Sequence, residues 1–277
     1  MNILEFSLSV WLGSLTAGFL GSLTGLGGGV VIVPLLTLAF GVDIRYAVGA
    51  SLVSVIATSS GAASAYVKEG YTNLRLGMFL EVATTFGAIV GAIVAGIVST
   101  RAIAIVFGIV LLYSAYLSRQ HRIEHLDSEP DPLATLLKLN GSYPTPDGQK
   151  FYTVRAVPVG FGLMFLAGVL SGLLGIGSGA VKVLAMDQAM RIPFKVSTTT
   201  SNFMIGVTAA ASAGVYLKRG YIDPGLAMPV MLGVLFGALL GARVLVRARI
   251  GLLRNIFSLV ILGLAVEMIY KGLTGGI

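Results

Sequence analysis

Lys182 stands inside an apolar stretch, "GIGSGAVKVLAMDQAM" (175–190), where a charged side chain has little water around it. A cation buried in a membrane costs several kcal/mol unless it is paired or faces a cavity, so such a lysine is a functional candidate by default. The chemistry it offers is recognition of an anion by a full positive charge. The alternatives are a side chain that reaches the membrane surface, or an ion pair with Asp187 or Glu81.

A glycine cluster precedes Lys182, and a similar cluster opens "GLGGGVVIVPLLTLAF" (25–40). A helix broken inside a membrane frees N–H and C=O groups, which protein or a water-filled cavity must then cover. Broken helices place their N-terminal ends near the midplane, where the helix dipole favours anions. The helices that begin after Gly29 and Gly179 are therefore predicted to face one anionic ligand from two directions. The alternative is close helix packing through small residues.

Hydroxyl side chains are concentrated in the helices that follow, "GASLVSVIATSSGAASAY" (49–66) and "STTTSNFMIGVTAAASAGVY" (197–216). They either surround an oxyanion as neutral donors or hydrogen-bond between helices. The candidate ligand contacts are Ser51, Thr58, Ser201, Asn202 and Thr208. Glu81 is the deepest acid of a full apolar span, so it is a candidate proton carrier for coupling and equally a candidate partner for a lysine.

The elements that position these residues are predicted to be membrane helices. Apolar residues make up 56% of the 277 residues, charged residues only 11%, and mean hydropathy is +0.91. Apolar runs long enough to cross a bilayer fall at 5–24, 46–67, 76–98, 102–117, 156–174, 196–217, 226–246 and 252–270. Two pieces, 30–40 and 180–190, reach only about 16 Å as helices and are too short to span. The N-terminal run lacks a basic region and is interpreted as the first membrane helix rather than a signal peptide.

The spans argue against several functional classes. The chain has no cysteine, and both histidines lie between the fourth and fifth spans, so thiolate chemistry and a metal centre within the spans are not expected. No nucleotide-binding motif is present, and carboxylates are few. We therefore expect no enzyme, no catalytic residues, no metal and no cofactor. The net charge of +7 is explained by loops that follow the positive-inside rule, not by a nucleic-acid partner.

The chain contains two copies of one unit. Shifting it by 150 residues aligns 17–115 with 167–265 without a gap and with about 28 identities, the pattern of a transporter with internal repeats. If each half crosses four times, the two sides carry 8 and 10 Lys and Arg residues, which is no bias. If each glycine break is a hairpin turn, one side carries 13 and the other 5. The 13 lie in 68–75, 118–155, 191–195 and 243–254. The second arrangement obeys the positive-inside rule and predicts inverted repeats, with both termini outside.

Three regions follow from these observations: a first membrane repeat (1–117), a polar connector (118–155) predicted to be cytoplasmic, and a second membrane repeat (156–277). Within the connector, "LATLLKL" (133–139) is compatible with one or two helical turns. The segment 142–154 is predicted to be a hairpin around Asp147-Gly148.

Two units of about 100 residues that open with "G-x-G-x-G/S-G" and continue into a Ser/Thr-rich helix resemble the sulfite exporter TauE/SafE family of membrane permeases. The stretch "GLLGIGSGAVKVLAMDQAMRIPFKVSTTTSNFMIGVTAAASA" (172–213) is especially similar. The resemblance covers both membrane halves but not clearly the connector. It implies transport of small sulfur-containing anions without ATP, and functional positions at Gly25, Gly27, Gly28, Gly29, Gly175, Gly177 and Gly179. Ser178 stands where the first copy has Gly28, and Leu184 where it has Pro34. We retain Ser178 and Lys182 as candidate contacts.

The expected protein is therefore an all-α polytopic membrane protein of two homologous, inverted repeats with glycine-broken short helices. The expected function is secondary transport of sulfite, thiosulfate or organosulfonates across the cytoplasmic membrane. An anion channel of the same fold is the alternative. The expected partners are the anionic substrate and the lipid bilayer, and a homo-oligomer is compatible with the sequence.

Overall fold

The computed structural model describes residues 2–24, 28–68, 70–119, 131–145, 148–245 and 250–275. The first set of helices is α1 (Ile3–Thr24), α2 (Gly29–Pro34), the π-helical turn η1 (Leu35–Ala39), α3 (Ile44–Lys68), α4 (Leu74–Ala95) and α5 (Thr100–Arg119). The second set is α7 (Val157–Leu174), α8 (Gly179–Leu184), the π-helical turn η2 (Ala185–Ala189), α9 (Phe194–Lys218), α10 (Pro224–Leu245) and α11 (Ile250–Thr274). The eight long helices predicted from hydropathy are confirmed, and so are the two 11-residue pieces.

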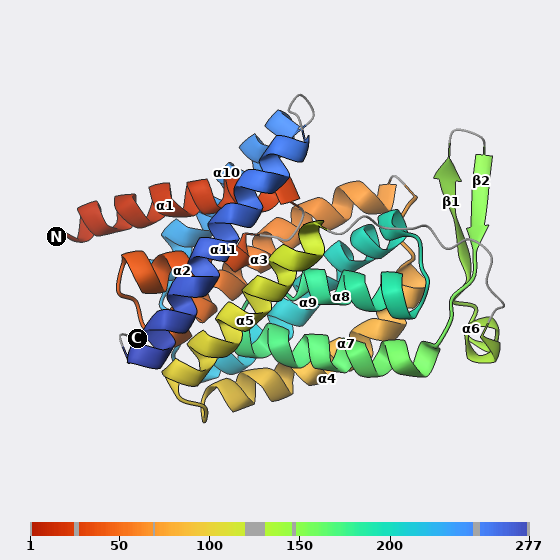
Figure 1. Cartoon of the computed structure of the whole chain (residues 1–277), viewed down its shortest axis with the longest axis horizontal. Coiled ribbons are helices and arrows are strands. Elements are labelled where there is room, and N and C mark those ends of the chain that lie inside the picture. Colours follow the sequence, from red (N-terminus) through yellow and green to blue (C-terminus); the bar gives the residue numbers. More distant parts are fainter. Residues whose placement is uncertain are drawn as a thin grey trace.

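The two sets match position by position. The bounds of α8, η2, α9 and α10 equal those of α2, η1, α3 and α4 shifted by 150 residues. Packing between the sets is reciprocal: α1 lies along α10 and α7 lies along α4, while α3 packs on α9 and α5 packs on α11 (Figure 1). The counterpart of α1 thus packs on the counterpart of α10, and α3 and α5 each pack on their own counterparts, the relationship that a pseudo-two-fold axis produces.

Small residues allow the closest of these contacts. A Cβ on Gly168 of α7 would clash with the carbonyl oxygen of Thr84 on α4. A Cβ on Gly18 of α1 would clash in the same way with Val234 on α10. The two pairs are related by the 150-residue shift, which takes Gly18 to Gly168 and Thr84 to Val234. Backbone-to-backbone approach through glycine is typical of membrane helices, where no hydrophobic force drives helices together.

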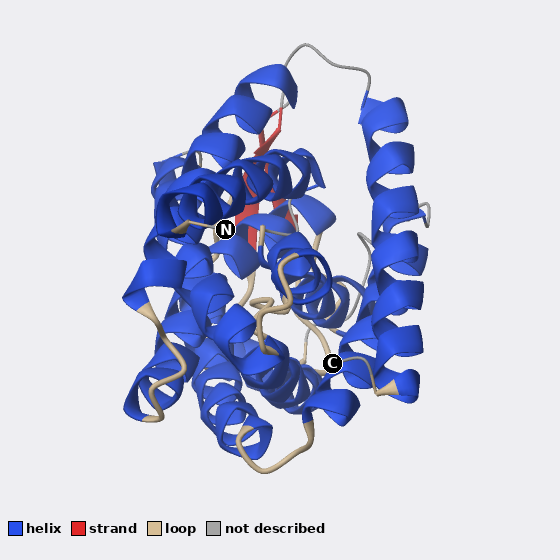
Figure 2. Cartoon of the chain, turned by 90° about the vertical axis from the view of Figure 1, so that its left-hand side faces the viewer, coloured by secondary structure: helices blue, strands red, loops and turns tan. Residues whose placement is uncertain are grey.

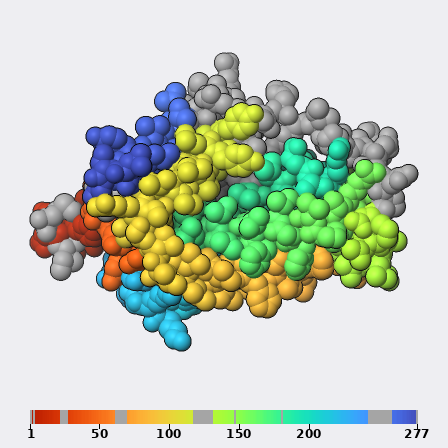
Figure 3. Space-filling view, turned by 60° about the horizontal axis from the view of Figure 1, so that its bottom comes forward, coloured from red at the N-terminus to blue at the C-terminus, as the bar shows by residue number. Residues whose placement is uncertain are grey.

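The surface and the interior have the polarity expected in a bilayer. Large apolar side chains recur at helical spacing on the outside, for example Met78, Val82 and Phe86 of α4, which are 65%, 51% and 64% exposed. Together α4, α5 and α7 form one continuous outer face (Figure 3). Hydroxyls such as those of Ser51, Thr84 and Thr208 are buried instead. Within the described residues, four helices are long and apolar enough to cross a membrane: α1, α4, α7 and α10.

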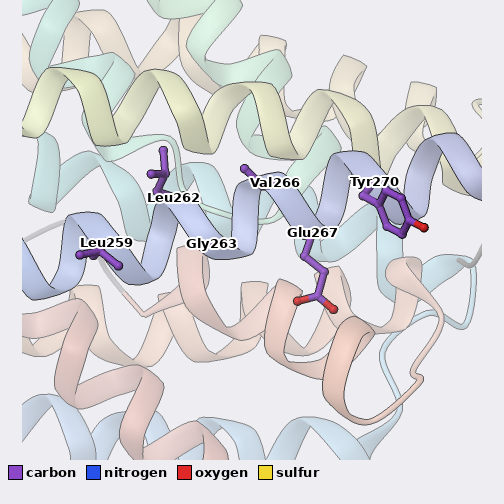
Figure 4. Close-up of a pocket in the computed structure, with 6 residues that line it drawn as sticks. All are labelled: Leu259, Leu262, Gly263, Val266, Glu267 and Tyr270. Carbon is purple, nitrogen blue, oxygen red and sulfur yellow. The ribbon is translucent and has the colours of Figure 1, made fainter.

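An apolar groove runs along the outer side of α11 (Figure 4). It is lined by Leu259, Leu262, Gly263, Val266, Glu267 and Tyr270. Glu267 lies 3.9 Å from Lys271 one turn later on the same helix. The groove is exposed, and its lining is apolar apart from Glu267 and the Tyr270 hydroxyl. It is therefore typical of a surface that faces lipid rather than of a substrate site.

The connector forms a small cap at one end of the helices. It contains α6 (Pro132–Leu136) and the strands β1 (Gly141–Thr145) and β2 (Gly148–Tyr152), which pair antiparallel with Tyr143 opposite Lys150. The hairpin predicted from Asp147-Gly148 is therefore confirmed. Strands are confined to this hairpin among the described residues, and helices make up the body (Figure 2). The start of α1 and the end of α11 lie at the opposite end of the molecule from the hairpin (Figure 1).

Asn73 fastens the cap to the helices. Its side chain accepts a hydrogen bond from the backbone N–H of Leu76 and so caps α4. Its Nδ2 donates to the carbonyl oxygen of Leu139 at 2.9 Å and to the hydroxyl of Tyr152 at 2.8 Å. Its own backbone N–H donates to Thr200 of α9. One residue thereby ties together both helix sets and the connector.

Candidate functional site

The two glycine breaks meet at the crossing of α3 and α9. Ser51 of α3 donates to the carbonyl oxygen of Gly175 at 2.8 Å. A Cβ on Gly29 would lie 2.8 Å from Ser51 Oγ and 3.1 Å from that same carbonyl oxygen. On the other side, Ser201 of α9 donates to the carbonyl oxygen of Gly179 at 3.3 Å. The hydroxyls of Ser51 and Ser201 thus bond to carbonyl oxygens at the second glycine break. This agrees with interhelical hydrogen bonding, one of the two roles that the sequence left open.

The second break relies on left-handed backbone. Gly175 and Gly177 both have φ of 68°, and Ser178 has φ of 41°, a conformation that L-residues rarely adopt. The hydroxyl of Ser178 donates to the carbonyl oxygen of Ala167 on α7. Ser178 is therefore turned toward the α7 backbone. Gly28 precedes α2 in a right-handed conformation, with φ of −65°. Gly25 and Gly27 lie outside the described residues.

Lys182 is fully buried and paired. Its ammonium group, on α8, donates to the hydroxyl of Thr208 on α9. It also lies 3.9 Å from a carboxylate oxygen of Glu81 on α4, and the two side chains are 0% and 9% exposed. The ion pair with Glu81, one of the alternatives that the sequence left open, is the one that the structure contains.

Thr208 links the two charges. Besides accepting from Lys182, its hydroxyl lies 2.7 Å from Glu81 Oε1, within hydrogen-bonding distance. Two further hydroxyls of α4 donate to the carboxylate of Glu81: Thr84 at 2.9 Å and Thr85 at 3.1 Å. These threonines were not among the sequence-based candidates. Their spacing of three and four residues from Glu81 on one helix was the available signal.

The remaining candidates are Thr58, Asn202 and Asp187. Thr58 of α3 is half-buried and donates to the carbonyl oxygens of Ser54 and Val55 on its own helix. Asn202 is half-buried beside Ser201 on α9. Asp187 of η2 is buried and accepts a hydrogen bond from Gln188. Within the described residues, no group of three or more His, Cys, Asp or Glu side chains could hold a metal ion.

The charged cluster exists once, although the fold repeats. The counterpart of Lys182 in the first helix set is Ile32, and the counterpart of Glu81 in the second set is Met231. Ile32 is completely buried. The positions equivalent to the two charged residues of the cluster are therefore apolar, while Thr58 is the counterpart of Thr208.

A second feature does repeat. The guanidinium group of Arg45, at the start of α3, lies 5.8 Å from the ring centre of Tyr221, just before α10. The ammonium group of Lys195, at the start of α9, lies 4.7 Å from the ring centre of Tyr71, just before α4. Arg45 and Lys195 are repeat counterparts, as are Tyr221 and Tyr71. Each cation–π contact joins one helix set to the other.

Comparison with known proteins now decides the family. The family model described as sulfite exporter TauE/SafE matches residues 10–268 of this chain. The chain belongs to this family. No solved structure shows a significant match.

Curated relatives that this TauE/SafE protein matches over most of their length are named as probable membrane transporters. The probable membrane transporter protein YunE of Bacillus subtilis is 28% identical over 278 residues, which cover 98% of this chain and 99% of the relative. A probable membrane transporter protein of Xylella fastidiosa (strain 9a5c) is 25% identical, over 98% and 97% of the two chains. The probable membrane transporter protein MJ0441 of Methanocaldococcus jannaschii is 26% identical over 82% of each. This TauE/SafE protein is therefore a multi-pass membrane transporter.

Proposed function

We propose that this transporter is a permease that moves small sulfur-containing anions, such as sulfite, thiosulfate or organosulfonates, across the cytoplasmic membrane. The observation that carries the proposal is the buried ammonium group of Lys182, which donates to the hydroxyl of Thr208 and lies 3.9 Å from Glu81 where the two helix sets meet. A full positive charge attracts an anion by roughly 4 kcal/mol at about 4 Å when the effective dielectric constant is about 20, before desolvation is counted. The family description, sulfite exporter, supports the same substrate class.

The proposed architecture is a pair of inverted repeats with the connector in the cytoplasm. The reciprocal packing of α1 on α10 and α7 on α4 supports a two-fold relationship between the repeats. The placement of the termini and the hairpin at opposite ends supports inversion (Figure 1). Reporter fusions at residues 140 and 277 test it: fusions that report opposite sides of the membrane agree with inversion, and fusions that report the same side contradict it.

Transport is tested with the purified chain in proteoliposomes. Counterflow of labelled sulfite, thiosulfate, sulfate and short organosulfonates should show saturable exchange for the anions that the site accepts. A channel, the alternative, would give conductance without counterflow. No counterflow and no conductance for any of these anions would contradict the proposed function.

Two threonines of α9 provide a matched pair for the site. Thr208→Val removes the hydroxyl that bridges Lys182 and Glu81, so it should reduce counterflow at least tenfold. Thr199 is also buried, but its hydroxyl bonds only to carbonyl oxygens of its own helix. Thr199→Val should leave counterflow close to that of the parent protein. Equal effects of the two changes would remove Thr208 from the site.

A further inference from the structure

The carboxylate of Glu81 occupies a set of donors that would suit an oxyanion. Its two oxygens lie within hydrogen-bonding distance of the hydroxyls of Thr84, Thr85 and Thr208, and Lys182 lies 3.9 Å away. Three hydroxyls and an ammonium group converge on one small, flat, negatively charged group. Charge-assisted hydrogen bonds of this kind are the strong ones, and they do not distinguish a carboxylate from a sulfonate by charge.

Two of the hydroxyl donors also have backbone acceptors, independent of the carboxylate of Glu81. Thr84 also donates toward the carbonyl oxygens of Leu80 and Glu81 at 3.4 and 3.1 Å, and Thr208 toward that of Met204 at 3.0 Å. These backbone acceptors belong to the threonines' own helices, so the hydroxyls have a resting position when no anion is present. The hydroxyls of Thr84 and Thr208 therefore keep a backbone acceptor when the carboxylate of Glu81 is not in place.

The charge balance of the cluster restricts what can enter. One lysine and one glutamate sum to zero, and an uncompensated buried charge costs several kcal/mol. The other charged side chains of the packed elements are distant along their helices. Arg75 precedes Glu81 by six residues, about 9 Å along α4, and Asp187 follows Lys182 by five, about 7.5 Å. Lys195 and Lys218 lie near the ends of α9, at least about 15 Å from Thr208 along the axis. Helix α7 has no charged residue.

We propose that Glu81 is an internal placeholder for the substrate, and that the transporter carries one monovalent oxyanion together with one proton. The anion takes the hydroxyls and the ammonium group of Lys182, while a proton from the same aqueous side binds a carboxylate oxygen of Glu81. The loaded cluster then holds Lys182 as a cation, Glu81 as a neutral acid and one anion, which again sums to zero. On release the anion and the proton leave together, and Glu81 returns to Lys182.

This coupling rests on the proposed transport function and narrows its substrate class. A monoanion such as an organosulfonate or hydrogen sulfite fits the balance. A dianion such as sulfate or thiosulfate leaves one negative charge uncompensated. The neutral acid of Glu81 can also donate one hydrogen bond to the bound anion, which the ionised carboxylate cannot.

The wild-type protein decides the coupling without any variant. Proteoliposomes that contain a trapped pH indicator are given an inward gradient of methanesulfonate, which stays a monoanion across the working pH range and so carries no proton of its own. The expected result is internal acidification with one proton per methanesulfonate, and uptake of sulfate at least tenfold slower. Methanesulfonate counterflow without proton movement, or sulfate uptake at an equal rate, would overturn the inference while leaving the transport function intact. Absence of counterflow for every anion would overturn both.

Glu81→Gln tests the residue. The glutamine is neutral like the protonated acid, so the variant should retain methanesulfonate counterflow but lose proton movement and stimulation by an inward pH gradient. Glu267→Gln is the matched control, because Glu267 also lies 3.9 Å from a lysine but on an exposed helix face. This control should keep one proton per anion. A Glu81→Gln protein that still acidifies the liposomes would overturn the role of Glu81. Should this variant fail to fold, the wild-type stoichiometry still decides the coupling.

Discussion

The charged groups of Lys182 and Glu81 belong to different repeats and meet 3.9 Å apart in the interior of the protein. The pair therefore contributes to the docking of α8 against α4 as well as to any chemistry of the site. Breaking such a pair on one side leaves a buried charge without compensation, which is more costly than removing both charges.

We accordingly expect Lys182→Met to lower the free energy of unfolding by about 3–5 kcal/mol, the range for a buried charge that loses its partner. The double change Lys182→Met with Glu81→Gln should recover most of this loss but not transport. Thermal unfolding in detergent and counterflow, measured on the same preparations, separate the two effects. Recovery of transport in the double variant would make the lysine a structural partner only.

The contact between α7 and α4 predicts opposite outcomes for two glycines of α7. Gly168→Ala places a methyl group against the carbonyl oxygen of Thr84 and should cost about 1–3 kcal/mol of stability. A Cβ on Gly162 meets nothing within 4 Å, so Gly162→Ala should be neutral or slightly stabilising through helix propensity. Unfolding temperatures in detergent check the pair, and equal shifts would contradict the packing.

The two cation–π contacts are predicted to hold the two repeats together at two places, each of which must open during transport. Because Arg45–Tyr221 and Lys195–Tyr71 join the repeats at counterpart positions, a transporter that opens alternately must release each contact in turn. The chain has no cysteine, so a cysteine pair at 71 and 195, or at 45 and 221, can be cross-linked specifically. Either cross-link should stop counterflow, and cleavage of a reducible cross-linker should restore it. A cross-link between cysteines placed at 142 and 151, which are paired within the hairpin, is the control and should have no effect.

The cap should loosen in alkali. Burial raises the pKa of Tyr152 from 10.0 to about 12, although the hydrogen bond from Asn73 opposes this shift. A raised pKa stabilises the docked cap fully below pH 10, and this contribution is lost as the pH rises from about 10 to 12. Protease cleavage of the connector should therefore accelerate over that interval in the parent protein. In Tyr152→Phe the part of the acceleration due to Tyr152 should disappear, and an unchanged profile would contradict the assignment.

Helix positions could be predicted from the sequence because they depend on local pattern. The 150-residue shift, the apolar runs and the glycine clusters predict two 11-residue pieces, which the structure forms as α2 with η1 and α8 with η2. The pair Asp147-Gly148 predicts the hairpin. The partner of Lys182 could not be chosen in the same way. Asp187 is five residues away in sequence, whereas Glu81 is brought to the lysine only by the packing of α4 and α9, which depends on tertiary contacts. The same packing brings Thr208 to Glu81, whereas Thr84 and Thr85 follow Glu81 by three and four residues on α4 and join the cluster through local helix geometry.

The single charged cluster also has a consequence for the two halves of the chain. Lys182 comes from the second repeat and Glu81 from the first, while Ile32 and Met231 hold the counterpart positions. At the cluster positions, a dimer of two first repeats would hold two glutamates and no lysine, and a dimer of two second repeats would hold two lysines and no glutamate. Neither half can therefore reconstitute the cluster with itself. The two halves of the present chain are complementary at these positions, and their covalent connection keeps them in equal numbers.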